Sequence, residues 1–395
     1  MPKHYKQSFP VEKWREIREL LYLFILFFYT ILLLHDAATA FLTYDVYSWA
    51  GTIAKLEQVV IPALLIVLYL SNIIFDRSYF ILKKEVIKII LFIVCAIVSI
   101  IHTAMFTFGA LMLCADFTSI KKLAKTSALA IFWCTVIGIV ACFRYAYVND
   151  IIIGRFGRQR HFFAFGHYAV WARQMLYAGI LYFVSKDNPI TLPELGIFAV
   201  LQCAVYYYST QRLTLRVSML TVIVFAVFVK YRAVKIDNKI MSGLSAIAYP
   251  ATMAFTLFLS LKYDEAIPFF SKLDSLLSTR ISLQSMMFDV FNVQLFAQKV
   301  KNVTDFYMYI DSGYLYMLFA YGLILTVLLL AVFSYMFWRS CKTNNTRLFA
   351  VLILTMVYLF VDNTPCDLTC SGVVLLFFPI ILKEHLNGKK QVQFL

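Results

Sequence analysis

Apolar runs recur along the whole chain, separated by short polar segments that carry most of the charge. Runs of about 17–25 residues have the length that a helix needs to cross the hydrocarbon core of a bilayer. No polar segment is long enough for an ordinary soluble domain. We therefore expect an all-α polytopic membrane protein with one domain, residues 1–395. The apolar pattern predicts about twelve transmembrane helices, at residues 20–34, 53–75, 89–101, 104–117, 127–147, 168–184, 196–210, 217–229, 241–261, 313–337, 348–361 and 371–382.

Composition agrees with a membrane protein. Hydrophobic residues make up 62% of the 395 positions and charged residues 15%, whereas a soluble domain is about half apolar and a quarter charged. The formal net charge of +14 would favour nucleic acid as a partner of a soluble protein. In a membrane protein it follows from the lysines and arginines that collect in cytoplasmic loops. We expect no nucleic-acid partner.

The basic residues also predict the orientation of the chain. Five of them precede the first predicted helix, which places both termini in the cytoplasm when the chain crosses the membrane twelve times. Inner segments then hold 23 of the 36 lysines and arginines, outer segments hold 12, and Lys55 lies within a helix. The outer basic residues fall in three segments: residues 144–173, the turn with Arg212 and Arg216, and a long extracytoplasmic loop at 262–312.

The first of these outer segments carries the strongest functional signal. Arginine presents a planar fork of donors that binds phosphate or carboxylate oxygens in pairs. Several arginines without a matching set of acids predict an anionic ligand at the membrane surface, such as a diphosphate-linked lipid. Ordinary phospholipid headgroups are the alternative ligand. The candidate residues are Arg155, Arg158, Arg160, His161, His167 and Arg173.

Further candidates come from the other outer segments. His167 opens a predicted helix, whose positive end lowers the pKa of the imidazole and favours a neutral proton acceptor; a structural role is the alternative. Arg212 and Arg216 are four residues apart and share a helix face. Arg280 opens an amphipathic segment, predicted at 281–300, that lies on the membrane, covers a cavity or packs on the bundle. Asp311 precedes the helix at 313–337. It is either a candidate base or the N-cap of that helix.

Several signatures of other function classes are absent from the sequence. There is no Walker A loop, no HExxH motif and no outer D-x-D motif. Intramembrane charges are sparse, with Lys55 and Glu57 the main ones, which argues against an ion-coupled transporter. Cys366 and Cys370 share one short loop, and the sequence leaves open whether they are oxidised.

Four segments, in this order, resemble those of the Wzy-type O-antigen and capsule polysaccharide polymerases, which share a family with the O-antigen ligases. They are the arginine segment ending in Phe165-Gly166-His167, residues 209–215 around Arg212, residues 273–283 around Arg280 with 295–298, and residues 311–314 with Tyr321-Gly322. The chain departs from the family pattern at Tyr168, Ala169, Gln211 and Ala297.

This resemblance implies a GT-C-related fold and a glycosyltransferase that needs neither metal nor cofactor, in a bacterial plasma membrane. The enzyme would transfer a growing glycan from undecaprenyl diphosphate to a lipid-linked repeat unit on the outer face. Donor, acceptor and membrane lipid are then its partners, and whether a chain-length regulator binds is left open. His167, Arg280 and Asp311 are the candidate catalytic residues. The candidate binding residues are Arg155, Arg158, Arg160, His161, Arg173, Arg212, Arg216 and Tyr314.

Two other functions stay open at this point. A ligase of the same family would transfer a finished glycan to a different acceptor, and the same outer arginines and histidine would serve it. A flippase or other transporter of lipid-linked glycans is the alternative from a different class. It requires a charged central cavity reachable from both faces, whereas the unexplained basic residues collect on the outer side.

Overall fold

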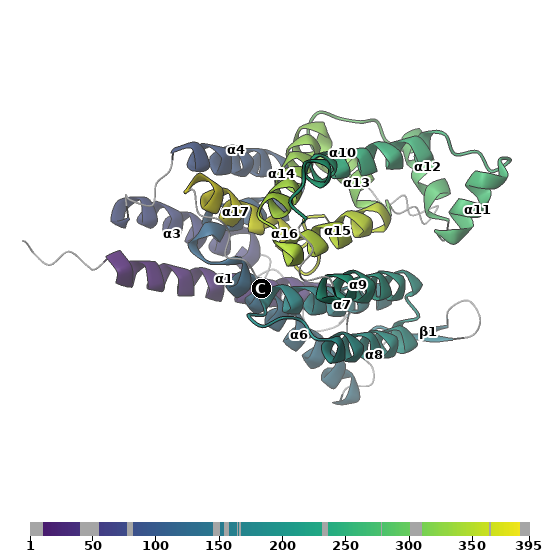
Figure 1. The fold of residues 1–395 in the computed structure, drawn as a ribbon, viewed down its shortest axis with the longest axis horizontal. Coiled ribbons are helices and arrows are strands. Elements are labelled where there is room, and N and C mark those ends of the chain that lie inside the picture. Colours follow the sequence, from purple (N-terminus) through teal and green to yellow (C-terminus); the bar gives the residue numbers. More distant parts are fainter. Residues whose placement is uncertain are drawn as a thin grey trace, which may run out of the picture.

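The computed structural model describes residues 11–39, 55–76, 82–144, 151–153, 158–163, 165, 167–230, 236–277, 279–300, 310–362 and 365–387. Most of the helices run roughly along the long axis of the molecule (Figure 1). They are α1 (Val11–Thr39), α3 (Ile61–Phe75), α4 (Leu82–Val98), α5 (Ala104–Cys114), α6 (Ile120–Arg144), α7 (Tyr168–Ser185), α8 (Leu192–Ser209), α9 (Arg212–Lys230), α10 (Lys239–Leu261), α11 (Pro268–Leu276), α12 (Arg280–Val290), α13 (Gly313–Tyr316), α14 (Gly322–Lys342), α15 (Thr346–Val361), α16 (Gly372–Leu375) and α17 (Phe377–Leu386).

Apolar helices of membrane-spanning length are present, as the hydrophobic pattern predicts. Within the described residues, four helical segments are long and apolar enough to cross a membrane: Leu56–Phe75, Ile120–Val140, Lys239–Leu261 and Gly313–Lys342. Ala104–Phe117 and Thr346–Val361 are apolar but shorter. Each of the predicted ranges overlaps a helix of the structure. The number of crossings, twelve, and the orientation stay predictions.

Several helices begin earlier than the apolar pattern indicates, and the difference is largest for three of them. α1, α4 and α6 start at Val11, Leu82 and Ile120, several residues before the predicted ranges. Their first turns are rich in lysine, arginine and glutamate, which are good helix formers. Hydropathy therefore located the apolar part of each helix and missed the charged turns at its beginning.

The arginine segment contains a short β-hairpin that hydropathy did not predict. Strand β1 (Ile151–Ile153) pairs antiparallel with β2 (Gln159–His161), and Ile152 lies opposite Arg160. Three consecutive isoleucines suit an extended backbone, because β-branched side chains pack well on a pleated surface. This hairpin lies at the same end of the bundle as α11 and α12, at the right of Figure 1.

The long loop predicted at 262–312 contains helices α11 and α12. The amphipathic helix predicted at 281–300 is wrong beyond Val290, where α12 ends. The chain after α12 bonds to the beginning of α14 instead: the Gln298 N–H donates to the Ala320 carbonyl at 3.1 Å, and the Leu323 N–H donates to the Gln294 carbonyl at 2.9 Å. These bonds replace the helical ones, so the segment stays extended.

Gly322 allows this crossing of two chain segments. Its φ is +82°, and a Cβ placed there would lie 2.4 Å from the carbonyl carbon of Phe296. A residue with a side chain would therefore be strained in φ and would clash with a backbone. The contact brings together residues 295–298 and Tyr321-Gly322, two segments that carry the family resemblance.

The hydrophobic core extends through most of the bundle, and one part of it lies where α10, α14 and α15 pack together. The ring of Tyr249 on α10 stacks on Phe333 of α14 with centroids 4.6 Å apart. The Tyr249 hydroxyl, fully buried, donates to the Leu352 carbonyl of α15 at 2.8 Å. One side chain thus fixes three helices, since it packs by its ring and satisfies its polar end.

Candidate functional site

Six of the candidate residues line one cavity of about 750 Å³, which we call the arginine cavity. Its volume is in the usual range for small-molecule sites. The walls come from the β2 strand and the residue before it, the beginnings of α7, α9 and α12, the ends of α8, α11 and α15, and Asp311, two residues before α13. The six candidates are Arg158, Arg160, Arg212, Arg216, Arg280 and Asp311.

The hairpin determines which residues of the arginine segment line the arginine cavity. Side chains alternate between the two faces of a strand, so Arg158 and Arg160 fall on one face and His161 on the other. The His161 ring stacks on Phe163 at 5.5 Å and meets Tyr208 edge-on at 5.6 Å. His161 therefore packs behind the hairpin and does not line the arginine cavity.

Arg160 is held in place by polar and aromatic contacts. Its Nε donates to the Thr210 hydroxyl at 2.8 Å, and one terminal nitrogen donates to the Tyr168 hydroxyl at 2.9 Å. The guanidinium carbon lies 4.6 Å from the centre of the Tyr168 ring, a cation–π distance. These contacts fix the side chain and leave its positive charge without a carboxylate partner in the described contacts.

Backbone carbonyls orient two further arginines. Arg280 donates from Nε to the Val361 carbonyl at 3.0 Å and from a terminal nitrogen to the Leu277 carbonyl at 3.3 Å. Arg216 donates to the Leu276 carbonyl at 2.8 Å. A carbonyl orients a guanidinium without cancelling its charge. Arg212 and Arg216 are both exposed on α9, one turn apart as their spacing predicts.

Two threonines of the arginine cavity have a strained backbone. Thr210, at the end of α8, has φ +50°, and Thr279, just before α12, has φ +65°. A β-branched residue rarely adopts this left-handed conformation, and such strain concentrates at functional sites. Both residues line the arginine cavity next to the arginines that they precede or contact.

Asp311 is the one carboxylate among the described residues that line the arginine cavity. Its Oδ2 lies 3.6 Å from Nε of Arg280, and about a third of the side chain (32%) is exposed. Burial raises its pKa above the ordinary value, and the nearby Arg280 only partly opposes this effect. The alternative N-cap role is wrong, because Ser312 occupies the N-cap of α13.

His167 caps helix α7 and lies outside the lining of the arginine cavity. Its Nδ1 accepts the Ala169 N–H at 3.2 Å, so the proton of the neutral ring is on Nε2, which is then a donor. Burial, together with Arg173 and Arg160, lowers its pKa to about 4. More than a third of the residue is exposed, so solvent screens part of this shift. The lowered pKa agrees with the prediction, but its cause is not the helix end.

Two further candidates, Arg173 and Tyr314, do not line the arginine cavity. Arg173 pairs with Asp362 at 2.7 Å and lines a different cavity. Tyr314 is fully buried, and its hydroxyl donates to the Met356 carbonyl at 3.3 Å, so it packs the core. Arg155 lies outside the described residues.

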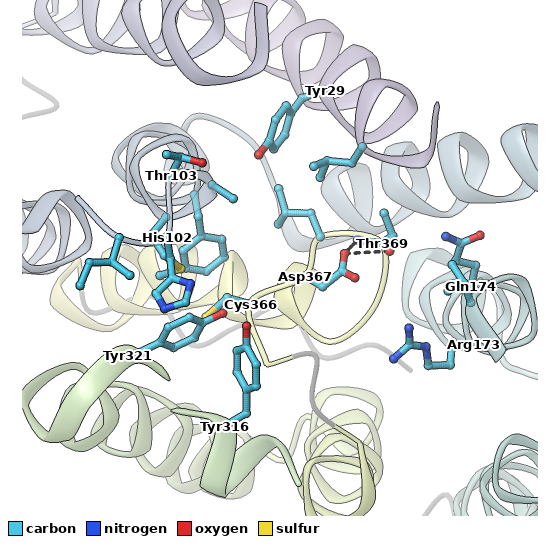
Figure 2. Close-up of a pocket in the computed structure, with 17 residues that line it drawn as sticks. Tyr29, His102, Thr103, Arg173, Gln174, Tyr316, Tyr321, Cys366, Asp367 and Thr369 are labelled. Carbon is cyan, nitrogen blue, oxygen red and sulfur yellow. Dashed lines mark hydrogen bonds between the residues drawn. The ribbon is translucent and has the colours of Figure 1, made fainter. Parts of the chain in front are cut away.

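The second cavity, shown in Figure 2, has a volume of about 620 Å³. Its polar lining comes from α1, from α7, from the turn between α4 and α5, from α13 and the residues between α13 and α14, and from the loop before α16. It adjoins the arginine cavity at the end of α15, where Val361 lines the arginine cavity and Asp362 binds Arg173 of the second one. Sequence reasoning missed its residues, among them His102, Gln174 and Asp367, because they form no motif and become neighbours only in the fold.

A buried ion network lies at the opposite end of α4 and α5. It consists of Lys84, Glu85 and Lys88 on α4 and Asp116 after α5, all at most 2% exposed. The two lysines each contact both acids, at 2.7 to 3.0 Å. The apolar pattern left these lysines outside the helix predicted at 89–101, whereas the structure has them on α4, buried against Glu85 and Asp116.

The donor groups present favour an anion over a metal ion. Within the described part of the chain, no three His, Cys, Asp or Glu side chains are grouped so that they could hold a metal. Cys366 and Cys370 are buried free thiols. The arginine cavity instead gathers guanidinium groups, which suit phosphate oxygens.

No family model, curated protein or solved structure matches the chain. The polymerase resemblance therefore stays a prediction, and the arrangement of the side chains carries the functional argument.

Proposed function

We propose that the protein is a membrane glycosyltransferase, a polysaccharide polymerase that transfers a growing glycan from undecaprenyl diphosphate to a lipid-linked repeat unit. One observation carries this proposal: five arginines from separate segments of the chain line one cavity with a single described carboxylate. Such an excess of guanidinium charge is unfavourable in the absence of an anion, because like charges repel. A diphosphate supplies the missing negative charge.

The arginines would act mainly on the leaving group. When the bond between the anomeric carbon and the diphosphate oxygen breaks, its electron pair stays with undecaprenyl diphosphate. Preorganised donors stabilise this developing charge without having to reorient. Arg160 and Arg280 are suited to this role, because hydroxyl and carbonyl acceptors already fix them.

Asp311 is the better candidate for the general base. A hydroxyl of the acceptor attacks the anomeric carbon, and its proton must be transferred to a base. The raised pKa of Asp311 makes it more basic than an ordinary aspartate. His167, in contrast, uses Nδ1 for the helix cap and presents a donor at Nε2.

The proposal is tested with Arg280→Ala and Arg212→Ala in cells that make the polymer. Lipid-linked glycans are separated on a gel, and the amount of each variant in the membrane is measured. We expect single repeat units to accumulate, with a rate of transfer reduced by about 10²–10³. Lys272→Ala is the matched control, because Lys272 is an exposed cation on α11 that does not line the arginine cavity.

The lipid-linked glycans that accumulate also distinguish a polymerase from a ligase and from a transporter. Full-length lipid-linked polymer that never reaches its final acceptor would identify a ligase. Repeat units retained on the cytoplasmic side would identify a transporter and refute the enzyme. Normal polymer in both arginine variants would refute the role of the arginine cavity.

A further inference from the structure

The second cavity differs from the arginine cavity in its chemistry. Its lining combines tyrosine rings with hydroxyl, amide, imidazole and carboxylate groups, which come from several elements and face a common space (Figure 2). Arg173 contributes a positive charge, but the Asp362 carboxylate binds it at 2.7 Å. The described lining of the cavity therefore has no free positive charge that would favour an anion, and most of its other polar groups are uncharged hydrogen-bonding groups that suit a neutral polar ligand. The polar residues are Tyr29, His102, Gln174, Tyr316, Tyr321, Asp367 and Thr369.

Gln174 shows that this cavity is built for a polar ligand. The residue is 1% exposed and lines the cavity, yet neither its amide oxygen nor its amide nitrogen has a hydrogen-bond partner among the described residues. A buried amide without partners is unfavourable, and most buried polar groups in proteins are satisfied. A ligand with both a donor and an acceptor, such as a sugar hydroxyl pair, satisfies this amide.

Two other polar side chains of the cavity, Asp367 and His102, are oriented by contacts within the protein. These contacts use one polar atom of each side chain. Oδ1 of Asp367 accepts the Thr369 N–H at 2.8 Å and the Thr369 hydroxyl at 2.7 Å. Nε2 of His102 lies 3.1 Å and 3.0 Å from the carbonyls of Gln298 and Ala320. Because carbonyls only accept, Nε2 carries the proton, and Nδ1 of the neutral ring is an acceptor. The other atom of each group is thus suited to bind a hydroxyl.

Aromatic rings complete the lining. Tyr316 and Tyr321 meet edge-on with centroids 5.4 Å apart, and the His102 ring meets Tyr321 edge-on at 5.5 Å. Rigid aromatic surfaces with polar ends suit ligands that have both apolar and polar faces. A sugar ring is such a ligand, because its C–H groups form apolar patches between its hydroxyls.

We propose that the second cavity binds an uncharged sugar, the acceptor end of the glycan. This inference rests on the proposed transferase function and adds the place of the acceptor. The two cavities approach each other at the end of α15, because Val361 lines the arginine cavity and the next residue, Asp362, binds Arg173 of the second cavity. A sugar in one cavity then lies next to a diphosphate in the other.

The test measures sugar binding without any transfer. The full chain is purified in a detergent that has no sugar headgroup, and saturation-transfer NMR is recorded with glucose, galactose, N-acetylglucosamine and lactose. Inorganic diphosphate binding is measured on the same samples by calorimetry. We expect binding of at least one sugar, weakened about tenfold in Gln174→Leu and in Asp367→Asn, because each variant removes hydrogen bonds to the ligand.

Folding of the variants is controlled within the same experiment. Leucine has a similar size to glutamine and removes an amide without partners, so Gln174→Leu should melt at the same or a higher temperature. Diphosphate binding should be unchanged in Gln174→Leu and weakened in Arg216→Ala, which should still bind the sugar. A polymerase test that fails while these results hold would refute the transferase and leave the sugar site standing.

Three results would overturn the inference. They are a wild-type chain that binds none of the sugars, sugar binding that is equal in the wild type and both variants, and a Gln174→Leu variant that melts at a clearly lower temperature. The last result would mean that ordered water satisfies the amide as part of the fold.

Discussion

The arginine cavity and the buried ion network are both rich in cations, but they balance their charge differently. In the network, Lys84 and Lys88 each contact both Glu85 and Asp116, and all four side chains are removed from solvent. In the arginine cavity, five arginines surround a single described carboxylate, and several of them are exposed. The four charges of the network balance one another, whereas the lining of the arginine cavity has more cations than described carboxylates, which is why we propose an anionic ligand there.

This difference helps to distinguish charged residues that stabilise the fold of a membrane protein from charged residues that bind a ligand. Lysines can be buried only when acids from the same fold meet them, since a lone buried ion is very unfavourable. Arg160 and Arg216, in contrast, are oriented by a hydroxyl and a carbonyl, which do not neutralise their charge, whereas Arg280 also lies 3.6 Å from the Asp311 carboxylate. The partners of a cation therefore say more about its role than its position in the sequence.

The largest effect is expected where the network is broken. Asp116→Asn removes one of the two acids and leaves two buried lysines with a single carboxylate. Breaking a buried ion pair in this way costs about 3–5 kcal/mol, a large fraction of the free energy of unfolding of an ordinary protein, about 5–15 kcal/mol. The amount of protein in the membrane and its melting temperature in detergent measure this loss.

Asp187→Asn is the matched control for that variant. Asp187 also pairs with a lysine, Lys121, at 2.7 Å, but its side chain is 84% exposed. Solvent and salt screen such a pair, so its removal should leave the melting temperature unchanged. Equal melting temperatures for Asp116→Asn and the wild type would show that the network does not stabilise the fold.

Asp311→Asn should reduce transfer by about 10²–10⁴ if Asp311 is the general base. Burial raises the pKa of Asp311 in the folded protein, so its charged form lowers stability at neutral pH and this penalty decreases as the pH falls through the raised pKa. The Asn variant should therefore melt at the same or a higher temperature at pH 7. Wild-type transfer should decline in acid already above the ordinary aspartate pKa of about 3.9.

The pH profile separates a base from a structural aspartate. If the variant retains wild-type activity, or loses activity only together with its fold, Asp311 is not the base. A wild-type rate that stays constant down to the ordinary pKa would contradict the raised pKa as well.

A smaller effect is expected for Arg216→Ala. Arg216 is exposed and donates to the Leu276 carbonyl, so its removal should hardly change stability. The affinity for inorganic diphosphate should fall about tenfold, because one charge-assisted hydrogen bond is lost. The difference should shrink at high salt, which screens exposed charges. Calorimetry at two salt concentrations measures both results, and Arg216→Lys should fall between Ala and the wild type.

Much of the helical fold could be predicted from the sequence, because apolar runs of membrane length leave few alternatives. Each predicted range overlaps a helix. Helix beginnings were missed where lysine and glutamate continue the helix past its apolar part, as in α4. The end of α12 was missed because residues 291–298 bond to α14, a contact between distant segments that no local pattern records.

The arginine cavity was predictable in part. The predicted orientation places its arginines on the outer side of the membrane, where lysine and arginine are expected to be scarce. This is why Arg158, Arg160, Arg212, Arg216 and Arg280 were identified before the fold brought them together. The second cavity was not predictable, because Gln174, inside α7, and Asp367, in the loop before α16, belong to no motif. Their role depends on which groups lack partners after folding.

The smallest effect is expected for His167→Asn, although the sequence favoured His167 as the base. Asparagine is a good N-cap and can accept the Ala169 N–H as Nδ1 of His167 does. Transfer should stay within a few-fold of the wild type, whereas His167→Ala should lower stability by about 1 kcal/mol through the lost cap. The melting temperatures and gel patterns of the two variants measure this contrast.

The pH dependence gives an independent measure of the same histidine. Its folded pKa of about 4 lies below the unfolded value of about 6.5. The unfolded chain therefore takes up the proton first, and His167 lowers the stability of the wild type progressively as the pH falls from about 6.5 towards 4. His167→Asn should lose this part of the acid sensitivity. If His167→Asn instead abolishes transfer while it melts like the wild type, the imidazole acts in the reaction. The contrast between a capping His167 and a catalytic Asp311 is then wrong.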